Sequence, residues 1–316
     1  MLGSFLPMKR YEELVARGRA EPSPLLAFDD EVVTASYNRE PFLIGHRLTT
    51  HPLFSLAHLF ALCRRMPRES ILYRTGHIPG DADLDTSYDR YKANLTLEQV
   101  LDRFEDNHAY ICINNPECDE EFAPVIEGLI GEVAARIDPL DPGISWYSTY
   151  IFISTRDSVT PYHMDREMNF LLQLQGRKTV HLWDPTDDAI MTSEEKDNLL
   201  AHIGGRPRYS AGIEARAMTY ELTPGLGVHH PFIAPHRVHT ASELSVSLAL
   251  TFRTRRSDMW TDAHRFNARM RGLGLHPRPI GANALVDRTK CGIARLGQGM
   301  HRRLEAFHRH GIDQTA

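Results

Sequence analysis

The chain has 316 residues, and its 36 Lys and Arg against 41 Asp and Glu give a formal net charge of −5 at pH 7 with histidine neutral. A negative total argues against nucleic acid as a partner, since binding a polyanion draws on positive charge. With 42% hydrophobic and 24% charged residues, the composition is that of a globular protein of one large domain or two modest ones, which excludes disorder, collagen and coiled coil.

Four cysteines fall at irregular spacings without a CxxC pair: Cys63, Cys112, Cys118 and Cys291. In a chain of this length we expect them to be the reduced thiols of a cytoplasmic protein. The most apolar early stretch, residues 53–63, is interrupted by Ser55 and His58, so we expect neither a signal peptide nor a membrane span.

Helical and strand patterns alternate in the first hundred residues. Apolar residues at helical spacing predict helices over Met8–Arg17 and Leu56–Arg65, and the apolar run Pro41–His46 predicts a buried strand. The segment Gly76–Asp89 is rich in Gly, Asp and Pro and is expected to be a loop. We therefore expect an N-terminal α/β region over residues 1–107 that packs on the rest of the fold.

A capping box of Thr96 and Gln99 predicts a helix that ends near Asp106, followed by a strand over Ala109–Ile113 and a helix over Glu120–Ile137.

After this helix the period of the apolar residues changes to two, which is typical of strands. Strands are expected over Tyr150–Ser154, Asn169–Leu174 and Lys178–Trp183, the last two joined as a hairpin around Gln175-Gly176. In Ser245–Phe252 small, partly polar residues alternate with large apolar ones, which suits a barrel strand that lines a cavity.

Two segments interrupt or follow these strands. Asp184–Leu222 is a long connection with a helix begun by Thr192 and Glu195, and such connections often border active sites. Residues 253–310 hold 13 Lys and Arg but only 4 Asp and Glu, in helix-compatible sequence that breaks near His276–Pro279. We expect a barrel over residues 108–256 and a helical region over residues 257–316.

The chemistry is concentrated in Ser158–Trp183, which contains the one His-x-Asp triplet of the chain, His163 and Asp165. Residues two apart on an extended segment point the same way, so both side chains can meet one cation. With a distant second histidine they would form the two-histidine, one-carboxylate triad of non-haem Fe(II) oxygenases. By itself the triplet is weak evidence for a metal site, since a chain with 17 histidines is expected to contain about one His-x-Asp triplet by chance.

The context of the triplet resembles the JmjC and cupin-like Fe(II)- and 2-oxoglutarate-dependent oxygenases, especially the asparaginyl hydroxylase that inhibits hypoxia-inducible factor. The match covers the T-P-x-H-x-D pattern formed by Thr160, Pro161, His163 and Asp165. The resemblance implies a mainly β fold with flanking helices, a double-stranded β-helix (cupin or jelly-roll) barrel between the N-terminal α/β region and the C-terminal helices.

The resemblance also implies the residues that bind 2-oxoglutarate. Thr160 and Lys178, thirteen residues after Asp165, would hold the distal carboxylate, and Asn169 and Thr251 would lie near the iron and the cosubstrate. A buried dianion needs a fixed cation at the end that is not on the metal. Tyr110 resembles a tyrosine that contacts the same carboxylate, with Tyr147 and Tyr150 as competitors.

The third iron ligand is expected at His236, twelve residues after Pro224 and sixteen before Phe252, which is the spacing of the family. His239 is the alternative, although three residues along a strand place it on the opposite face. The neighbouring pair His229 and His230 is expected to line the mouth of the site or to be exposed.

The resemblance implies a dioxygenase that hydroxylates a C–H bond on a peptide or protein side chain or on a small molecule. Such an enzyme releases succinate and CO2 from 2-oxoglutarate. An N-demethylase would begin with the same step. A cupin dioxygenase or isomerase without 2-oxoglutarate usually carries His-x-His, and the one such triplet here, His308 and His310, lies outside the expected barrel. A non-catalytic cupin-like binding module stays open. Some relatives form homodimers through C-terminal helices, so a homodimer is a further expectation.

Overall fold

The computed structural model describes residues 4–92, 94–242 and 244–297, and these form two compact units. The first unit comprises Met1–Thr186 and Arg208–Thr254, and the second Asp187–Pro207 and Arg255–Ala316. The helices are α1 (Met8–Ala20), α2 (Asp30–Ser36), α3 (Leu56–Arg65), α4 (Leu84–Arg90), α5 (Leu97–Asp102), α6 (Ala123–Ile137), α7 (Ser193–Ala201) and α8 (Arg255–Gly272). The strands are β1 (Ser4–Phe5), β2 (Leu26–Ala27), β3 (Leu43–His46), β4 (Ile71–Arg74), β5 (Tyr110–Asn114), β6 (Ile144–Thr155), β7 (Val159–His163), β8 (Met168–Gln175), β9 (Lys178–Leu182), β10 (Met218–Leu222), β11 (Leu226–His230), β12 (His236–Thr240) and β13 (Leu244–Thr254).

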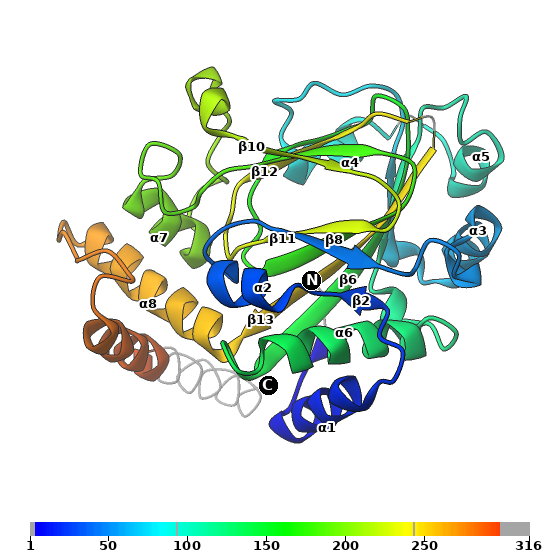
Figure 1. Ribbon diagram of the computed structural model, residues 1–316. Helices are drawn as coiled ribbons and strands as arrows, with labels where there is room; N and C mark the ends of the chain where they lie inside the picture. The colour runs from blue at the N-terminus through cyan, green and yellow to red at the C-terminus, as the bar shows by residue number, and fades with distance from the viewer. Residues whose placement is uncertain (1–3, 93, 243, 298–316) are drawn as a thin grey trace, which may run out of the picture. The chain divides into compact units, whose positions relative to one another are not determined.

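Two antiparallel sheets make up the first unit (Figure 1). The large sheet has the order β2-β3-β11-β8-β13-β6-β5-β4, with β1 added beside β6, and the small sheet has the order β10-β9-β12-β7. Within the described residues, no strand pairing joins the two sheets into one closed barrel. The predicted mainly β architecture with flanking helices is present, and the expected N-terminal region contributes β1, β2, β3 and β4 to the large sheet.

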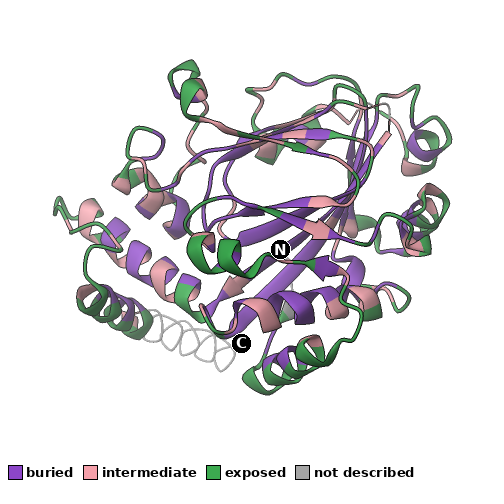
Figure 2. Cartoon of the chain, viewed as in Figure 1, coloured by how far each residue is buried: buried purple, intermediate pink, exposed green. Residues whose placement is uncertain are grey.

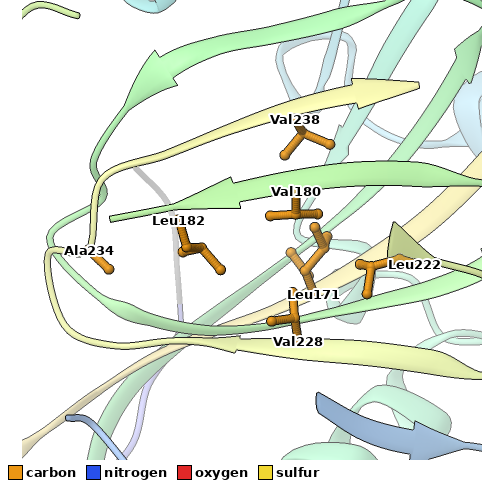
Figure 3. Close-up of a cluster of buried hydrophobic side chains, with 8 residues drawn as sticks. Leu171, Val180, Leu182, Leu222, Val228, Ala234 and Val238 are labelled. Atoms are coloured by element: carbon orange, nitrogen blue, oxygen red, sulfur yellow. The ribbon is translucent and has the colours of Figure 1, made fainter. Parts of the chain in front are cut away.

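The core of the first unit lies between the two sheets. Figure 3 shows a cluster of buried apolar side chains to which β8, β11 and β13 of the large sheet and β9, β10 and β12 of the small sheet all contribute. The central strands are buried along almost their whole length (Figure 2). The inward face of β13 carries Ser245, Ser247, Ala249 and Thr251, the small face expected from its alternation, so polar groups line part of the interior.

The hairpin expected around Gln175-Gly176 is wrong. β8 pairs with β11 and β13, whereas β9 pairs with β10 and β12, so the chain crosses here from the large sheet to the small one. Gly176 has φ 75°, and a Cβ there would lie 2.0 Å from the carbonyl oxygen of Leu244. The same glycine therefore serves a tight crossover that local sequence does not distinguish from a hairpin turn.

The helices predicted in the N-terminal part are present, although α5 ends at Asp102 and not near Asp106. α1 and α3 lie where the apolar spacing predicts them, and the capping box of Thr96 and Gln99 is present. The segment Gly76–Asp89 is not all loop, because α4 begins at Leu84. The Asp83 side chain caps this helix by accepting a hydrogen bond of 2.8 Å from the amide of Asp85, a start signal hidden in an acidic stretch.

The second unit joins α7, from the long connection, to α8. The capping box of Thr192 and Glu195 begins α7 as expected. Asp197 on α7 is buried and accepts hydrogen bonds from His264 at 2.7 Å and Arg271 at 2.8 Å, both on α8. Helix resumes over residues 284–297 after the predicted break. Residues 298–316 of the expected C-terminal region lie outside the described part of the chain, and no described helix has the length and apolarity to span a membrane.

The packing of α1 on α6 generates a stability prediction. A Cβ at Gly18 would lie 2.1 Å from the backbone oxygen of Gly131, so Gly18→Ala should lower the free energy of unfolding by about 1–3 kcal/mol through overpacking. Gly128 on α6 has open space around it, and Gly128→Ala should raise the free energy by about 0.5–1 kcal/mol through helix propensity. Urea unfolding of both variants tests this, and equal effects would contradict the close approach.

Candidate active site

Two histidines face each other across neighbouring strands of the small sheet. In the β7–β12 pair the Cα of His163 lies opposite that of His236, and the centroids of the two rings are 4.0 Å apart. Both side chains are buried, and His236 points between the sheets because Val238, two residues along, belongs to the core cluster. The register of one strand pair therefore brings together residues that are 73 positions apart in sequence.

Asp165 completes the cluster just beyond the end of β7. Its carboxylate oxygens lie 3.8 Å from Nε2 of His163 and 3.9 Å from Nε2 of His236. The candidate ligand atoms of the three residues lie within 4.8 Å of one another, and among the described residues this is the one such group. The Asp165 side chain is 34% exposed, against 7% for each histidine, so solvent reaches the cluster from its carboxylate side.

Backbone carbonyls orient both imidazoles. Nδ1 of His163 lies 2.8 Å from the carbonyl oxygen of Pro161, and Nδ1 of His236 lies 3.1 Å from that of Ala234. When Nδ1–H donates to these oxygens, each Nε2 keeps its lone pair on the side of Asp165. Metal-binding histidines are commonly fixed in this way, so the arrangement is preorganised for a metal ion.

A β-bulge in β7 puts Thr160 on the same face as His163. Between the pairs His236–His163 and Val238–Thr160 the strand β12 advances by two residues and β7 by three. Without the extra residue, two positions three apart would face opposite ways. The Thr160 hydroxyl lies 2.9 Å from the hydroxyl of Tyr110, which is buried on β5. Two of the predicted cosubstrate residues thus form a direct hydrogen bond.

Lys178 is buried at the start of β9. It is 2% exposed, and its Nζ donates a hydrogen bond of 2.7 Å to the hydroxyl of Ser247 on β13. Burial lowers the pKa of Lys178 to about 7, with a further lowering by the nearby Arg74 and an opposing effect from Cys112. The lysine is therefore held in a site that does not by itself stabilise its charge.

Arg74 is a second buried cation in this region, and the sequence analysis missed it. The side chain is 2% exposed and its guanidinium lies over the Tyr110 ring, 4.2 Å from the centroid. One nitrogen donates to the carbonyl oxygen of Val159, and Nη1 has no hydrogen-bond partner. Within the described residues, neither Arg74 nor Lys178 has a carboxylate partner. An arginine on an early strand carried no local signal of burial.

A row of polar side chains crosses the inner face of the large sheet. Asn169 on β8 is paired in register with His230 on β11 and with Thr251 on β13. All three are buried and face inward, since Val228, Leu171 and Ala249, each two residues away, belong to the core cluster. Oδ1 of Asn169 has no hydrogen-bond partner.

The alternative residues are separated by strand geometry. His239 lies on the other face of β12, where it is half-exposed and its Nε2 lies 3.7 Å from the Asp157 carboxylate. Tyr147 is on the outer face of β6, opposite to Tyr150, whose pKa is raised by burial and by the nearby Asp165. Neither Tyr147 nor Tyr150 makes the hydrogen bond to Thr160 that Tyr110 makes.

The expectation that His229 and His230 line the mouth or are exposed is wrong. His229 is 0% and His230 3% exposed. The outer face of β11 packs His229 between aromatic rings, and burial lowers its pKa to about 3. The expectation assumed that two polar side chains in a row lie near solvent. Their strand, β11, lies between β3 and β8 in the large sheet and is buried on both faces.

Comparison with known proteins agrees with this architecture. The family model described as the cupin-like domain matches residues 75–257. The HSPB1-associated protein 1 homolog of Danio rerio is 30% identical over 116 residues, which is 34% of this chain and 26% of that protein, so the match spans about a quarter of the relative.

Similar solved structures come from Escherichia coli. The X-ray structure of ycfD has a TM-score of 0.46 and 15% identity, covering 86% of this chain and 68% of that chain. A ribosomal oxygenase YcfD structure in complex with cobalt and 2-oxoglutarate has a TM-score of 0.43 and 14% identity, covering 85% and 65%. The family match extends over more than half of this chain and confirms the predicted cupin-like fold. The chain belongs to the cupin-like domain family.

Proposed function

We propose that the chain is an Fe(II)- and 2-oxoglutarate-dependent oxygenase that hydroxylates a C–H bond on a peptide or protein side chain. The observation that carries the proposal is the pairing of a His163–Asp165–His236 cluster with two buried cations, Lys178 and Arg74, that have no carboxylate partner among the described residues. The cluster of two histidines and one carboxylate suits a divalent metal ion. The two buried cations suit one end of a dianion whose other end binds that metal.

The donor set fits Fe(II). Two imidazole nitrogens and one carboxylate on one side of a cation leave further coordination positions open, which is the donor set of non-haem iron oxygenases. The carbonyl oxygens of Pro161 and Ala234 keep the imidazoles oriented before metal binds. When bound, Fe(II) with 2-oxoglutarate supplies oxidation of a C–H bond by dioxygen, with succinate and CO2 as the products from the cosubstrate.

The two cations favour a carboxylate in the interior. Burying a charge without a counter-ion is strongly unfavourable. A carboxylate bound near Lys178 and Arg74 would supply the counter-ion that both buried cations lack. The hydroxyls of Thr160 and Tyr110, already hydrogen-bonded to each other, can turn their donors toward the same carboxylate. Asn169 and Thr251 would then bind the part of the cosubstrate that lies nearer the metal.

The chain shields most of the cluster from solvent. The two histidines are buried, as are Lys178, Tyr110, Asn169 and Thr251, whereas Thr160 is half-buried, and the apolar cluster between the sheets excludes water. Asp165 is the most exposed member, so a substrate would reach the metal from its side. The choice of a peptide or protein side chain rests on the resemblance to the asparaginyl hydroxylase.

Metal binding tests the ligand set. His236→Ala should abolish stoichiometric binding of Co(II), used as a stable substitute for Fe(II), because the cluster loses one of its three ligands. His239→Ala should bind Co(II) as the unchanged protein does, because His239 lies on the outer face of β12. Isothermal titration calorimetry with both variants measures this, and loss of binding in the His239 variant alone would reverse the assignment.

Turnover tests the enzymatic activity. Protein incubated with Fe(II), 2-oxoglutarate and oxygen, with and without a library of peptides, should produce succinate. Asp165→Ala should lower succinate formation to the level of the reaction without protein, since the open metal site is lost. Succinate formation no higher with the unchanged protein than with the Asp165 variant would favour a non-catalytic binding module.

The affinity for 2-oxoglutarate should depend on pH through Lys178. The pKa of this lysine is lowered to about 7 in the protein without ligand, while the dianion binds the charged form. Above pH 7 binding must therefore take up a proton, and the Kd should rise by up to about tenfold per pH unit. Calorimetry of the Co(II) protein at pH 6, 7 and 8 measures the Kd and the proton uptake. Lys178→Met should bind weakly with little pH dependence, and a flat profile in the unchanged protein would refute the role.

A further inference from the structure

His230 is a buried histidine in contact with the candidate metal cluster. It lies on the inner face of β11, is 3% exposed, and its ring packs edge-on against His236 with centroids 4.6 Å apart. Both of its nitrogens, Nδ1 and Nε2, are buried without a hydrogen-bond partner. An imidazole carries at least one N–H donor in every tautomer and protonation state, so a buried donor here lacks an acceptor.

The adjacent His229 shows that this is not the rule for buried histidines in β11. Its Nε2 accepts a hydrogen bond of 3.2 Å from the amide of Asn38, and its Nδ1 lies 3.1 Å from the carbonyl oxygen of Asn169. His229 is therefore satisfied by the fold. His230, one residue away on the opposite face, is not, although leaving a buried polar group unpaired is unfavourable.

The metal ion itself is not the missing hydrogen-bond partner of His230. The candidate ligand atoms that lie within 4.8 Å of one another in the described residues belong to His163, Asp165 and His236, and His230 is outside that group. Across the β11–β8 pair His230 faces Asn169, whose Oδ1 is also unpartnered. Two unsatisfied polar side chains thus line one wall beside the metal cluster, which points to a polar ligand bound there.

We propose that His230 is a cosubstrate-binding residue whose N–H donates a hydrogen bond to the metal-bound carboxylate of 2-oxoglutarate. This inference rests on the proposed function. The cosubstrate would be held at both ends by buried donors: Lys178 and Arg74 at the distal carboxylate, and His230 beside Asn169 at the end on the metal. An N–H to carboxylate bond is charge-assisted and is among the stronger hydrogen bonds in a site of this kind.

The matched variants His230→Leu and His229→Leu separate binding from folding. His230→Leu removes a buried donor that the fold does not satisfy, so the Tm of the metal-free protein should be unchanged or higher, and the Co(II) affinity should be unchanged. The Kd for 2-oxoglutarate in the Co(II) protein should rise about tenfold, through the loss of one charge-assisted hydrogen bond. His229→Leu should lower the Tm and leave the Kd for 2-oxoglutarate unchanged.

Three results would overturn the inference. An unchanged Kd for 2-oxoglutarate in His230→Leu would remove His230 from the cosubstrate site, loss of Co(II) binding would make it a metal ligand, and a lowered Tm with no effect on binding would make it structural. If His230→Leu fails to fold, His230→Ala is measured instead, and full affinity without the imidazole donor would likewise count against the role. Failure of the unchanged Co(II) protein to bind 2-oxoglutarate would refute the proposed function itself.

Discussion

The register of β7 against β12 is the constraint on which the rest of the site depends. It sets His163 opposite His236, and the bulge within the same strand pair turns Thr160 to the side of His163. A shift of one residue in this pairing would send one histidine to the outer face, where the half-exposed His239 already lies. The histidine rings are then fixed by carbonyl oxygens of their own strands or turns, so the small sheet builds most of the metal cluster from backbone geometry.

The large sheet contributes the electrostatic part of the site. Its inner face carries Ser247, which accepts a hydrogen bond from Lys178, and the polar row of Asn169, His230 and Thr251. At its edge β4 and β5 supply Arg74 and Tyr110. Buried cations and unpaired donors destabilise a protein unless a ligand completes them, and the apolar cluster between the sheets offsets that cost. The two sheets therefore hold buried cations and unpaired hydrogen-bond donors in fixed positions. Specific binding of a small dianion requires such preorganised groups.

Sequence reasoning succeeded where the relevant spacing is local. The segment from Thr160 to Lys178 spans β7, β8 and the start of β9, and its residue spacing matched the resembling family closely enough to name side chains that cluster in the structure, Tyr110 among them. It failed where the answer depends on which strands pair. Gly176 marks a crossover between sheets and not a hairpin, and Arg74 and His230 are buried by strands distant in sequence. A charged or imidazole side chain carries no local sign of such burial.

The sequence by itself determined the alternating strands of the cupin-like fold, the capped helices and the spacing of His163, Asp165 and Lys178, because backbone periodicity and turn chemistry act over a few residues. The tertiary structure placed the expected His236, and not the alternative His239, opposite His163, and it alone showed that Arg74 is buried without a carboxylate partner and His230 without a hydrogen-bond partner. These outcomes depend on the pairing of strands separated by tens of residues and on the desolvation that follows. Both are properties of the whole packed interior, which no short stretch of sequence encodes.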